Sequence, residues 1–347
     1  MSINKATQLA AVLIVRDEAR SISRCLQSVG PWVDRLLVLD TGSTDTTVEL
    51  ARAAGAHVHK TAWLGSFALA RNQALDLANA DWNLILDADE WIESGGEQIR
   101  LWCVGSPRLG KVCVHSSYDR VGASAANEIM PTELSWITRL LPRGVRYEGR
   151  VHEQPVSPLP RERVPLYLNH DGYRDAQLNK KQGRNRELLL LELTERPSDP
   201  YILYQLGKDE EGRSEFAAAC VHYQNALKTT GRNANWRHGL LLHYLHCLSR
   251  AGRSGEALKL AGAEMEAFPD SPDFYFVVGN LALDQAISDP EHAISDWLPL
   301  AAVSWERCLA IGERPDLEGS VHGRGSHLAQ HNLDVLRSQT GLALVRK

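Results

Sequence analysis

The first ninety residues alternate between continuous apolar runs and segments whose apolar residues recur at helical spacing. Residues 9–15 read LAAVLIV, the kind of run found in a parallel strand that is buried on both faces. Residues 18–29 place Ile22, Leu26 and Val29 on one helical face. Strands at this spacing predict an α/β fold with a doubly wound sheet, whose ligands bind beyond the carboxyl ends of the strands. The same reasoning predicts further strands at 35–40, 56–60 and 82–90, and further helices at 44–54 and 66–78.

The pattern changes twice further along the chain. Residues 112–171 are rich in short, irregular β-type segments, and the chain reads as helical from residue 180 onward. This predicts an α/β domain at 1–183 and an all-α domain at 184–347. The helical part shows the residue spacing of tetratricopeptide units, although a generic helical bundle is the alternative. The matching positions are Leu206, Gly207, Ala219, Tyr223 and Ala226, then Ala257, Ala261 and Pro269, then Tyr275, Gly279, Ala301 and Trp305.

The tetrapeptide Asp-Thr-Gly-Ser at 40–43 resembles the catalytic loop of aspartic proteases. Such a protease needs two carboxylates that share one proton, and the chain has no second Asp-(Thr/Ser)-Gly. The nearest candidate, residues 170–172, reads His-Asp-Gly and lacks the hydroxyl residue. Residues 44–54 have candidate N-caps and an acidic first turn, and Gly55 follows them, so they predict a helix. The tetrapeptide is therefore interpreted as a loop on the ligand-binding edge of the sheet.

Composition narrows the possible partners and the compartment. The formal net charge is −5, from 38 Lys+Arg and 43 Asp+Glu, which gives no electrostatic reason to expect nucleic acid. Six cysteines are scattered with no CxxC spacing, which fits buried thiols in a reducing compartment. The apolar run at 9–15 is too short for a membrane span and no small-residue cleavage site follows it, so we expect a cytoplasmic protein without a membrane span.

Two acids end the fourth predicted strand. Asp87 and Asp89 alternate along an extended segment, so both carboxylates are expected to project to one side and share one task. Carboxylate oxygens of this kind suit Mg²⁺ or Mn²⁺, with a diphosphate completing the coordination. A lone acidic pair of this type is often a solvated turn. Here an acid also follows the first strand at Asp17, and Arg71-Asn72 lies in the preceding helix.

The N-terminal half resembles inverting family 2 glycosyltransferases of the GT-A fold, which have a Rossmann-like nucleotide-binding, mostly parallel sheet. The resemblance covers about residues 9–173, roughly half of the chain. The segments that carry it are VLIVRDEARSISRCLQSV, VDRLLVLDTGSTDTTVELARAAGAHV, FALARNQALDLANADWNLILDADE, RLLPRGVRYEGRVHEQ and NHDGY. The helical tail resembles the tetratricopeptide-like extension of one branch, which includes bacterial peptide S-/O-glycosyltransferases of the sublancin-synthase type. Lipopolysaccharide-core glucosyltransferases share the N-terminal half without this tail.

The resemblance implies roles for the donor side. It implies that Asp40 contacts the base or ribose of a UDP-sugar, and that Arg16 and Glu18 line the nucleoside pocket; relatives often carry Asn where Arg16 stands. It also implies that Arg71 faces the nucleotide or diphosphate, that Asp87 contacts the ribose and the metal, and that Asp89 binds the metal directly.

The acceptor side leaves alternatives open. An inverting transfer needs a general base to take the acceptor's proton, and Glu153 is the first candidate, with Asp171 and Glu133 as rivals. His152 or His170 is a candidate third metal ligand or acceptor contact, against the alternative of a hydrogen-bonded structural residue. Trp136 and Tyr147 are candidates for a wall on which the sugar stacks, although for any single aromatic a core position is the commoner outcome.

Together these features predict a metal-assisted inverting glycosyltransferase that uses a UDP-sugar and Mn²⁺ or Mg²⁺. The acceptor stays open among peptide, protein and glycan. The helical half is expected to present the acceptor or a partner, or else to brace the fold or build a homodimer; its acidic run at 209–211 is expected to form a solvated face. The alternatives are a helical-repeat scaffold with an inactive nucleotide-sugar domain, a transferase for lipopolysaccharide or another cell-surface glycan, and a nucleotidyltransferase. The last would carry a loop rich in Gly, Arg or Lys after the first strand, where this chain has VRDEARS.

Overall fold

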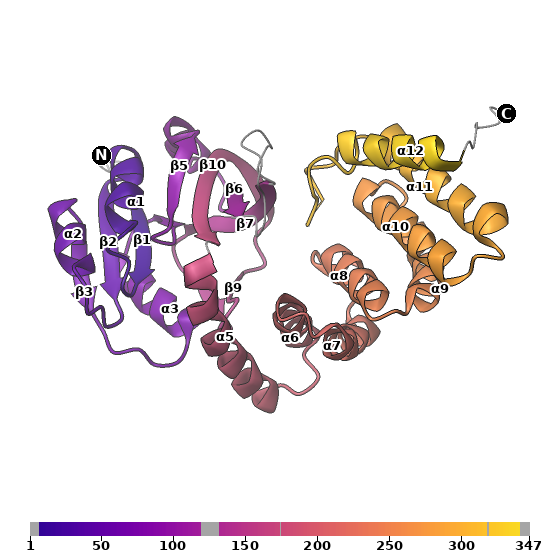
Figure 1. Ribbon diagram of the computed structural model, residues 1–347. Helices are drawn as coiled ribbons and strands as arrows, with labels where there is room; N and C mark the ends of the chain where they lie inside the picture. The colour runs from indigo at the N-terminus through magenta and orange to yellow at the C-terminus, as the bar shows by residue number, and fades with distance from the viewer. Residues whose placement is uncertain (1–6, 119–131, 174, 318, 341–347) are drawn as a thin grey trace. The chain divides into compact units, whose positions relative to one another are not determined.

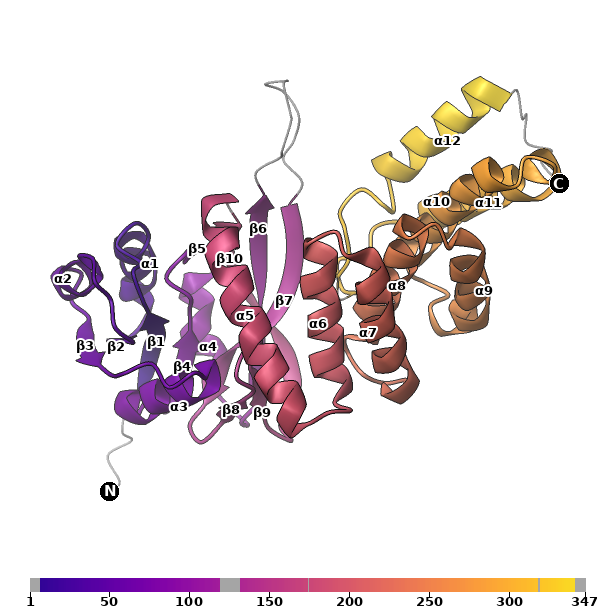
Figure 2. The same cartoon turned by 60° about the horizontal axis from the view of Figure 1, so that its bottom comes forward.

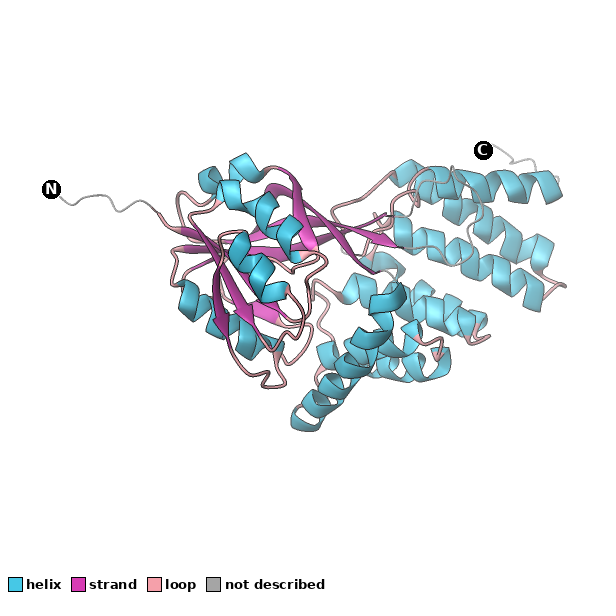
Figure 3. Ribbon diagram, turned by 60° about the vertical axis from the view of Figure 1, so that its left-hand side comes forward, coloured by secondary structure: helices cyan, strands magenta, loops and turns pink. Residues whose placement is uncertain are grey.

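A computed structural model describes residues 7–118, 132–173, 175–317 and 319–340. The chain divides into two compact units, residues 1–192 and 193–347, and each is described here by itself. Strands occur in the first unit, whereas the second is built from helices (Figure 3). The predicted order of an α/β domain followed by an all-α domain is therefore confirmed.

The first unit is organised around an eight-stranded sheet in the order β3-β2-β1-β4-β7-β6-β10-β5 (Figure 1). The strands β3, β2, β1 and β4 run parallel, as expected from the alternating pattern. Beyond β4 the pairing is mixed, because β7 is antiparallel to both β4 and β6 while β10 is parallel to β6 and antiparallel to β5. The strands are β1 (Leu9–Val15), β2 (Arg35–Asp40), β3 (His57–Lys60), β4 (Trp82–Ile85), β5 (Glu90–Ser94), β6 (Leu109–Tyr118), β7 (Thr132–Pro142) and β10 (Arg161–Tyr173).

The burial of β1 explains its uninterrupted apolar sequence. Leu9, Ala11 and Leu13 pack into a core with helix α1 (Ile22–Val29), whereas Ala10 and Val12 pack on the opposite face with helix α3 (Phe67–Ala78). Both faces of this strand are therefore covered, so neither set of alternating positions can be polar. The remaining elements of the unit are α2 (Thr47–Ala53), α4 (Ile99–Trp102), the 3₁₀ turns η1 (Gly30–Trp32) and η2 (Gly96–Gln98), and the small hairpin of β8 (Arg146–Glu148) and β9 (Gln154–Val156).

One predicted strand is wrong in its extent. The segment 82–90 was expected to be a single strand, but β4 ends at Ile85 and β5 begins at Glu90. Between them the chain turns, with the Glu90 N–H donating to the Asp87 carbonyl oxygen at 3.0 Å. The argument that alternation along a strand places Asp87 and Asp89 on one side therefore does not hold.

The second unit is a series of antiparallel helix pairs (Figure 2). Helix α5 (Asp175–Glu195) contains the division between the units. It is followed by α6 (Pro200–Gly212), α7 (Phe216–Thr229), α8 (Arg237–Arg250), α9 (Ser254–Glu264), the 3₁₀ turn η3 (Met265–Ala267), α10 (Pro272–Ser288), the π-helical turn η4 (Ala293–Trp297), α11 (Leu298–Ile311) and α12 (His327–Thr340).

Two glycines identified in the repeat pattern mark the closest helix contacts. A Cβ on Gly207 of α6 would lie 2.3 Å from Cε1 of Tyr223 on α7. A Cβ on Gly279 of α10 would lie 2.5 Å from Nε1 of Trp305 on α11. The same relation occurs in two helix pairs, α6 with α7 and α10 with α11, as expected of tetratricopeptide-like repeats.

The acidic run at 209–211 does not form a solvated face. Glu210 is buried, and the Asp209 side chain is only 8% exposed beside Arg213. Glu211 is also largely buried, and its carboxylate accepts hydrogen bonds from the Tyr223 hydroxyl at 2.6 Å and the His243 ring at 2.8 Å. Helical neighbours from α7 and α8 therefore cover a segment that the sequence alone predicted to be exposed.

Candidate functional site

The loops that follow β1 and β2 are tied together at the carboxyl edge of the sheet. Asp17 adopts a left-handed backbone with φ 55°, and its carboxylate accepts from the Thr44 N–H at 2.7 Å. The Asp17 N–H donates in return to the Ser43 hydroxyl at 2.9 Å. The Glu18 N–H donates to the Thr47 hydroxyl at 2.7 Å. The Asp-Thr-Gly-Ser tetrapeptide is therefore part of a fixed double loop on the ligand-binding edge.

Asp40 ends β2 inside this double loop. Its side chain is buried, and Oδ1 accepts from the Ser43 N–H at 3.0 Å. Gly42 between them has φ 113°, which a residue with a side chain rarely adopts. Arg16 is exposed and Glu18 is half-buried, with the Ser21 hydroxyl donating to the Glu18 carboxylate at 3.0 Å. Asp40, Arg16 and Glu18 thus come from the two loops that meet here.

A buried arginine joins two of the predicted residues. Arg71 lies on α3, which begins at the Ser66 cap, and its side chain is 7% exposed. Its Nη2 donates to Asp87 Oδ1 at 2.8 Å, and its Nε donates to the Glu153 carboxylate. The guanidinium also lies 5.6 Å from the ring centre of Tyr147. The structure therefore brings together Arg71, Asp87 and Glu153 from three separate segments.

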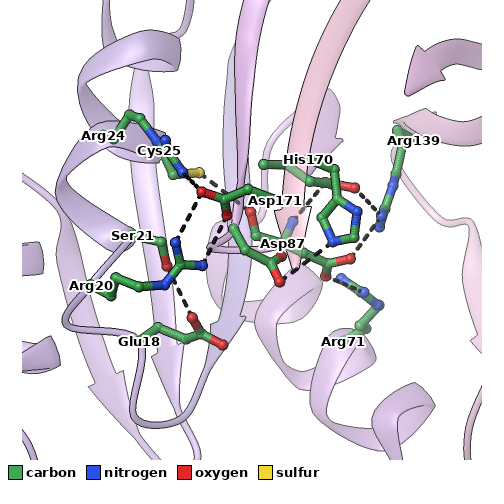
Figure 4. A network of polar contacts seen from close by, with 12 residues as sticks. Glu18, Arg20, Ser21, Arg24, Cys25, Arg71, Asp87, Arg139, His170 and Asp171 are labelled. Atoms are coloured by element: carbon green, nitrogen blue, oxygen red, sulfur yellow. Dashed lines mark hydrogen bonds and ion pairs between the residues drawn. The ribbon is translucent and has the colours of Figure 1, made fainter. Parts of the chain in front are cut away.

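A second buried arginine holds the same aspartate from the other side. Arg139 on β7 donates through Nη2 to Asp87 Oδ2 at 2.8 Å and to Glu90 Oε1 at 2.7 Å (Figure 4). Glu90 Oε2 accepts from the Asp87 N–H at 2.9 Å. Burial acts to raise the pKa of Asp87, but Arg139 and Arg71 outweigh it and hold that pKa well below its usual range. Asp87 is therefore an oriented carboxylate anion, and 39% of its side chain is exposed to solvent.

Asp89 faces a different partner. Its Oδ2 lies 3.4 Å from Nε2 of His170, a residue of β10, and its side chain is 5% exposed. Burial acts to lower the pKa of His170, but the hydrogen bond and the charge of Asp89 together raise it. Carboxylate oxygens suit Mn²⁺ and Mg²⁺, and a neutral imidazole nitrogen is a common metal ligand. Asp89 and His170 are therefore candidate ligands for a divalent cation.

Asp171, a rival candidate for the base, is held by Arg20, which precedes α1, and by Arg24 on α1. Arg20 donates through both terminal nitrogens at 2.9 Å, and Arg24 donates at 2.6 Å (Figure 4). The Arg24 guanidinium lies 3.6 Å from the ring centre of Trp91. Burial acts to raise the pKa of Asp171, yet the two arginines lower it well below its usual range. A carboxylate stabilised in this way is a weak base.

The other candidates are scattered. His152 is exposed and has φ 52°. Within 7–118, 132–173, 175–317 and 319–340, no group of three or more His, Cys, Asp or Glu side chains could by itself hold a metal. Tyr147 is buried in the core, while Trp136 lies under Arg163, whose guanidinium is 4.4 Å from the ring centre. Glu133 belongs to β7, and its side chain is outside the described part of the structure.

Four residues of the network had no role assigned from the sequence: Arg20, Arg24, Glu90 and Arg139. For two of them a signal was present. Arg139 interrupts an apolar run, SWITRLLP, and a charge at a buried strand position must be paired. Glu90 extends the acidic pair by one residue and is also buried. Arg20 and Arg24 are spaced like any exposed helical residues, so the sequence did not distinguish them.

The segment that carries most of this site matches a known protein family. Residues 10–96, which contain β1 to β5 and the loops described above, match the model of glycosyl transferase family 2. A TPR repeat-containing protein from Synechococcus elongatus is 31% identical over 68% of this chain and 60% of its own length. Glycosyltransferase SunS from Bacillus subtilis prophage SPbeta is 28% identical over 57% of this chain and 48% of its own length.

The chain thus spans about half the length of these curated relatives. Among solved structures, glucosyl-3-phosphoglycerate synthase from Mycobacterium tuberculosis in complex with Mn²⁺ and uridine diphosphate is 25% identical. That match covers 31% of this chain and 44% of the other, with a TM-score of 0.27. The chain therefore carries a glycosyl transferase family 2 domain at residues 10–96.

Proposed function

We propose that this protein is an inverting glycosyltransferase that moves a sugar from a UDP-sugar to an acceptor nucleophile. The observation that carries the proposal is the paired arginine clamp on Asp87, placed where β4 ends in a family 2 domain. Burying charges without function is costly, so two buried cations around one partly exposed carboxylate support a ligand site. Ligands of open α/β sheets bind at this edge.

The double loop after β1 and β2 suits the nucleoside end of the donor. Asp40 is held at the end of β2 by the Ser43 N–H, which fixes the direction of its carboxylate. Arg16 and Glu18 come from the loop bonded to it. In the proposed complex, Asp40 contacts the base or ribose, and Arg16 and Glu18 line the pocket around it.

The diphosphate end lies toward the acids after β4. Asp89 and His170 would hold Mn²⁺ or Mg²⁺, with Asp87 oriented beside them; an ion of this type takes few protein ligands and completes its shell with phosphate oxygens and water. When bound, the ion would offset charge on the leaving diphosphate. Arg71 and Arg139 hold Asp87 in one orientation, so the carboxylate does not have to be ordered when the donor arrives. His152, exposed on its loop, is the weaker ligand candidate.

The transfer itself needs one base. The acceptor oxygen or sulfur bonds to the anomeric carbon as the bond from that carbon to the diphosphate oxygen breaks, and the acceptor proton passes to a carboxylate. We assign this role to Glu153, whose carboxylate is oriented by Nε of Arg71 and is thereby joined to Asp87 through one guanidinium. Asp171 is less suited to the role, because Arg20 and Arg24 engage both of its carboxylate oxygens, whereas Arg71 donates to one oxygen of Glu153.

The helical unit supports a proposal about the acceptor. Stacked tetratricopeptide-like pairs form an extended surface of the kind that binds peptides or partner helices. We assign acceptor or partner binding to this unit, which favours a peptide or protein acceptor over a glycan. Bracing of the catalytic unit or formation of a homodimer is the competing role.

The test is a screen for UDP release from a panel of UDP-sugars by the full chain. We expect turnover with Mn²⁺ or Mg²⁺, collapse of turnover in EDTA, and near-complete loss in Asp89→Ala. Glu97→Ala removes an exposed carboxylate of η2 and is the matched control, with unchanged turnover expected. Full turnover by the EDTA-treated enzyme would contradict the metal role. Turnover with GDP- or CDP-sugars alone would contradict the donor class. UDP binding without turnover of any donor would instead favour the inactive scaffold.

A further inference from the structure

The helical unit contains a pocket of about 500 Å³ between α7, α8 and α9. Its apolar part is made by Leu227 of α7, Tyr244 of α8 and Leu260 of α9. Tyr244 is buried at 4% exposure, so its ring belongs to the floor of the pocket. The pocket is open to solvent, with apolar residues at its base and polar groups around them.

The two acids that line this pocket are already engaged by arginines. Both oxygens of Glu264 accept from Nη2 of Arg237, at 2.7 and 2.9 Å. Both oxygens of Glu256 accept from Nη2 of Arg253, each at 2.8 Å. The carboxylates therefore have cationic partners of their own and do not neutralise the remaining charges of the pocket.

Two lysines on different helices supply the remaining charge. Lys228 on α7 and Lys259 on α9 are exposed, and neither has a carboxylate within ion-pair distance among the residues that the structure describes. The Lys228 ammonium donates a hydrogen bond to the amide oxygen of Asn225 at 3.3 Å. Arg237 is 8% exposed at the same pocket, and its Nε has no hydrogen-bond partner within the described residues. The pocket thus combines an apolar floor with two unneutralised cations.

From this arrangement we infer that the pocket between α7, α8 and α9 binds an acidic peptide segment that carries an apolar side chain. The apolar side chain lies over Leu227, Tyr244 and Leu260, and the flanking carboxylates pair with Lys228 and Lys259. A peptide suits the pocket because its walls are two helices, with one lysine on each, and residues of an extended chain can reach both walls. This inference concerns binding alone, so it can hold or fail whether or not the chain transfers sugar.

The test uses three fluorophore-labelled peptides of equal length, with alternating Asp and Leu, Lys and Leu, or Asp and Ser. Fluorescence anisotropy with the full chain should show saturable binding of the Asp–Leu peptide and much weaker binding of the other two. Lys228→Glu and Lys259→Glu should each weaken that binding about fivefold or more, and the loss should shrink as salt rises. Lys208→Glu, the same charge change on α6 outside the pocket, is the matched control with unchanged binding expected.

Three results would overturn the inference. They are equal binding of the three peptides, equal weakening by Lys208→Glu, and no saturable binding of the Asp–Leu peptide up to about 1 mM. Because both pocket lysines are exposed, their variants should unfold at the wild-type temperature. A circular dichroism melt checks that the variants are folded, so that a loss of binding cannot be attributed to unfolding.

Discussion

Both units of this protein bury charged side chains, but the α/β unit gathers them at the carboxyl edge of its sheet. In the α/β unit, the ion pairs at the carboxyl edge join residues that are far apart in sequence, as in Arg139 with Asp87 and Arg71 with Glu153. In the helical unit, aromatic rings pack closely on glycines of the neighbouring helix, as in Tyr223 on Gly207. Buried charge costs stability unless it is fully paired, whereas ring-on-glycine contacts add packing. The network of charges therefore indicates function.

The largest effect should come from removing the proposed base in the α/β unit. Glu153→Gln should lower the transfer rate by about 10²–10⁴-fold, because no carboxylate then takes the proton from the sugar acceptor. Binding of UDP should persist, since the substitution removes an interaction of the chemical step. Single-turnover transfer measures the rate of the chemical step, and a UDP titration of the same preparation measures the affinity for the nucleotide. A near-normal transfer rate would move the role to Asp171 or Glu133.

The next prediction tests how much stability the protein loses when a buried carboxylate is left without its arginine partner. Arg139→Met leaves Glu90 buried without its cation and removes half of the clamp on Asp87, so the free energy of unfolding should fall by about 3–5 kcal/mol. Arg143→Met, one residue beyond β7, removes a guanidinium that is 50% exposed and paired with Asp81, and should change stability by under about 1 kcal/mol. Urea unfolding of Arg139→Met and Arg143→Met measures both changes in the free energy of unfolding. Equal losses would mean that Arg139 is an ordinary surface pair.

A smaller effect tests the packing half of the comparison. Gly207→Ala should lower the free energy of unfolding by about 1–3 kcal/mol, because the new Cβ would overlap the fully buried Tyr223 ring. Gly262→Ala is the matched change on α9, where a Cβ meets nothing within 4 Å, and it should raise stability by about 0.5–1 kcal/mol. Thermal unfolding of both variants checks the signs. The packing account is wrong if both substitutions stabilise.

The smallest effect concerns the pH dependence of the Asp171 ion pairs. The folded pKa of Asp171 lies below its unfolded value of about 3.9, so its contribution to stability is present above that value and is lost as pH falls toward the folded pKa. At neutral pH the free energy of unfolding should be about 1–2 kcal/mol higher for wild type than for Asp171→Asn. The difference is modest because Arg20 and Arg24 are 42% and 44% exposed. Urea unfolding across pH should show that difference shrinking below about pH 4. A pH-independent difference would exclude the ion pairs as its source.

The sequence predicted the strands that position the site more completely than the side-chain contacts within it. The bounds of β1 and β2 agree with the structure. In β1 the apolar run ends where burial ends, because Val15 is buried and Arg16 after it is exposed. The break after Ile85 was missed, because the turn is held by Glu90 and Arg139, and Arg139 lies about fifty positions away. Arg71 and Glu153 were identified separately, but no local pattern shows that they meet. Such long-range pairing is set by the fold and is not contained in either segment.

The helical unit shows the same limit in another form. The glycine and aromatic positions of the repeats were identified from their spacing, because each lies in contact with the adjacent helix. The burial of the acids at 209–211 was not, since α7 and α8 provide the covering side chains Tyr223 and His243. The pocket lysines, Lys228 and Lys259, lie on helices separated by α8, and the sequence alone gave no reason to compare them.

The central claim is that the carboxyl edge of the α/β unit binds a uridine nucleotide, and calorimetric titration of the full chain with UDP tests it most directly. In the presence of Mn²⁺, wild type should bind UDP saturably and melt at a higher temperature with UDP bound. Asp40→Ala should weaken that binding without unfolding the protein, and GDP and CDP should bind less tightly than UDP. Absence of saturable UDP binding, or tighter binding of GDP or CDP, would contradict the account.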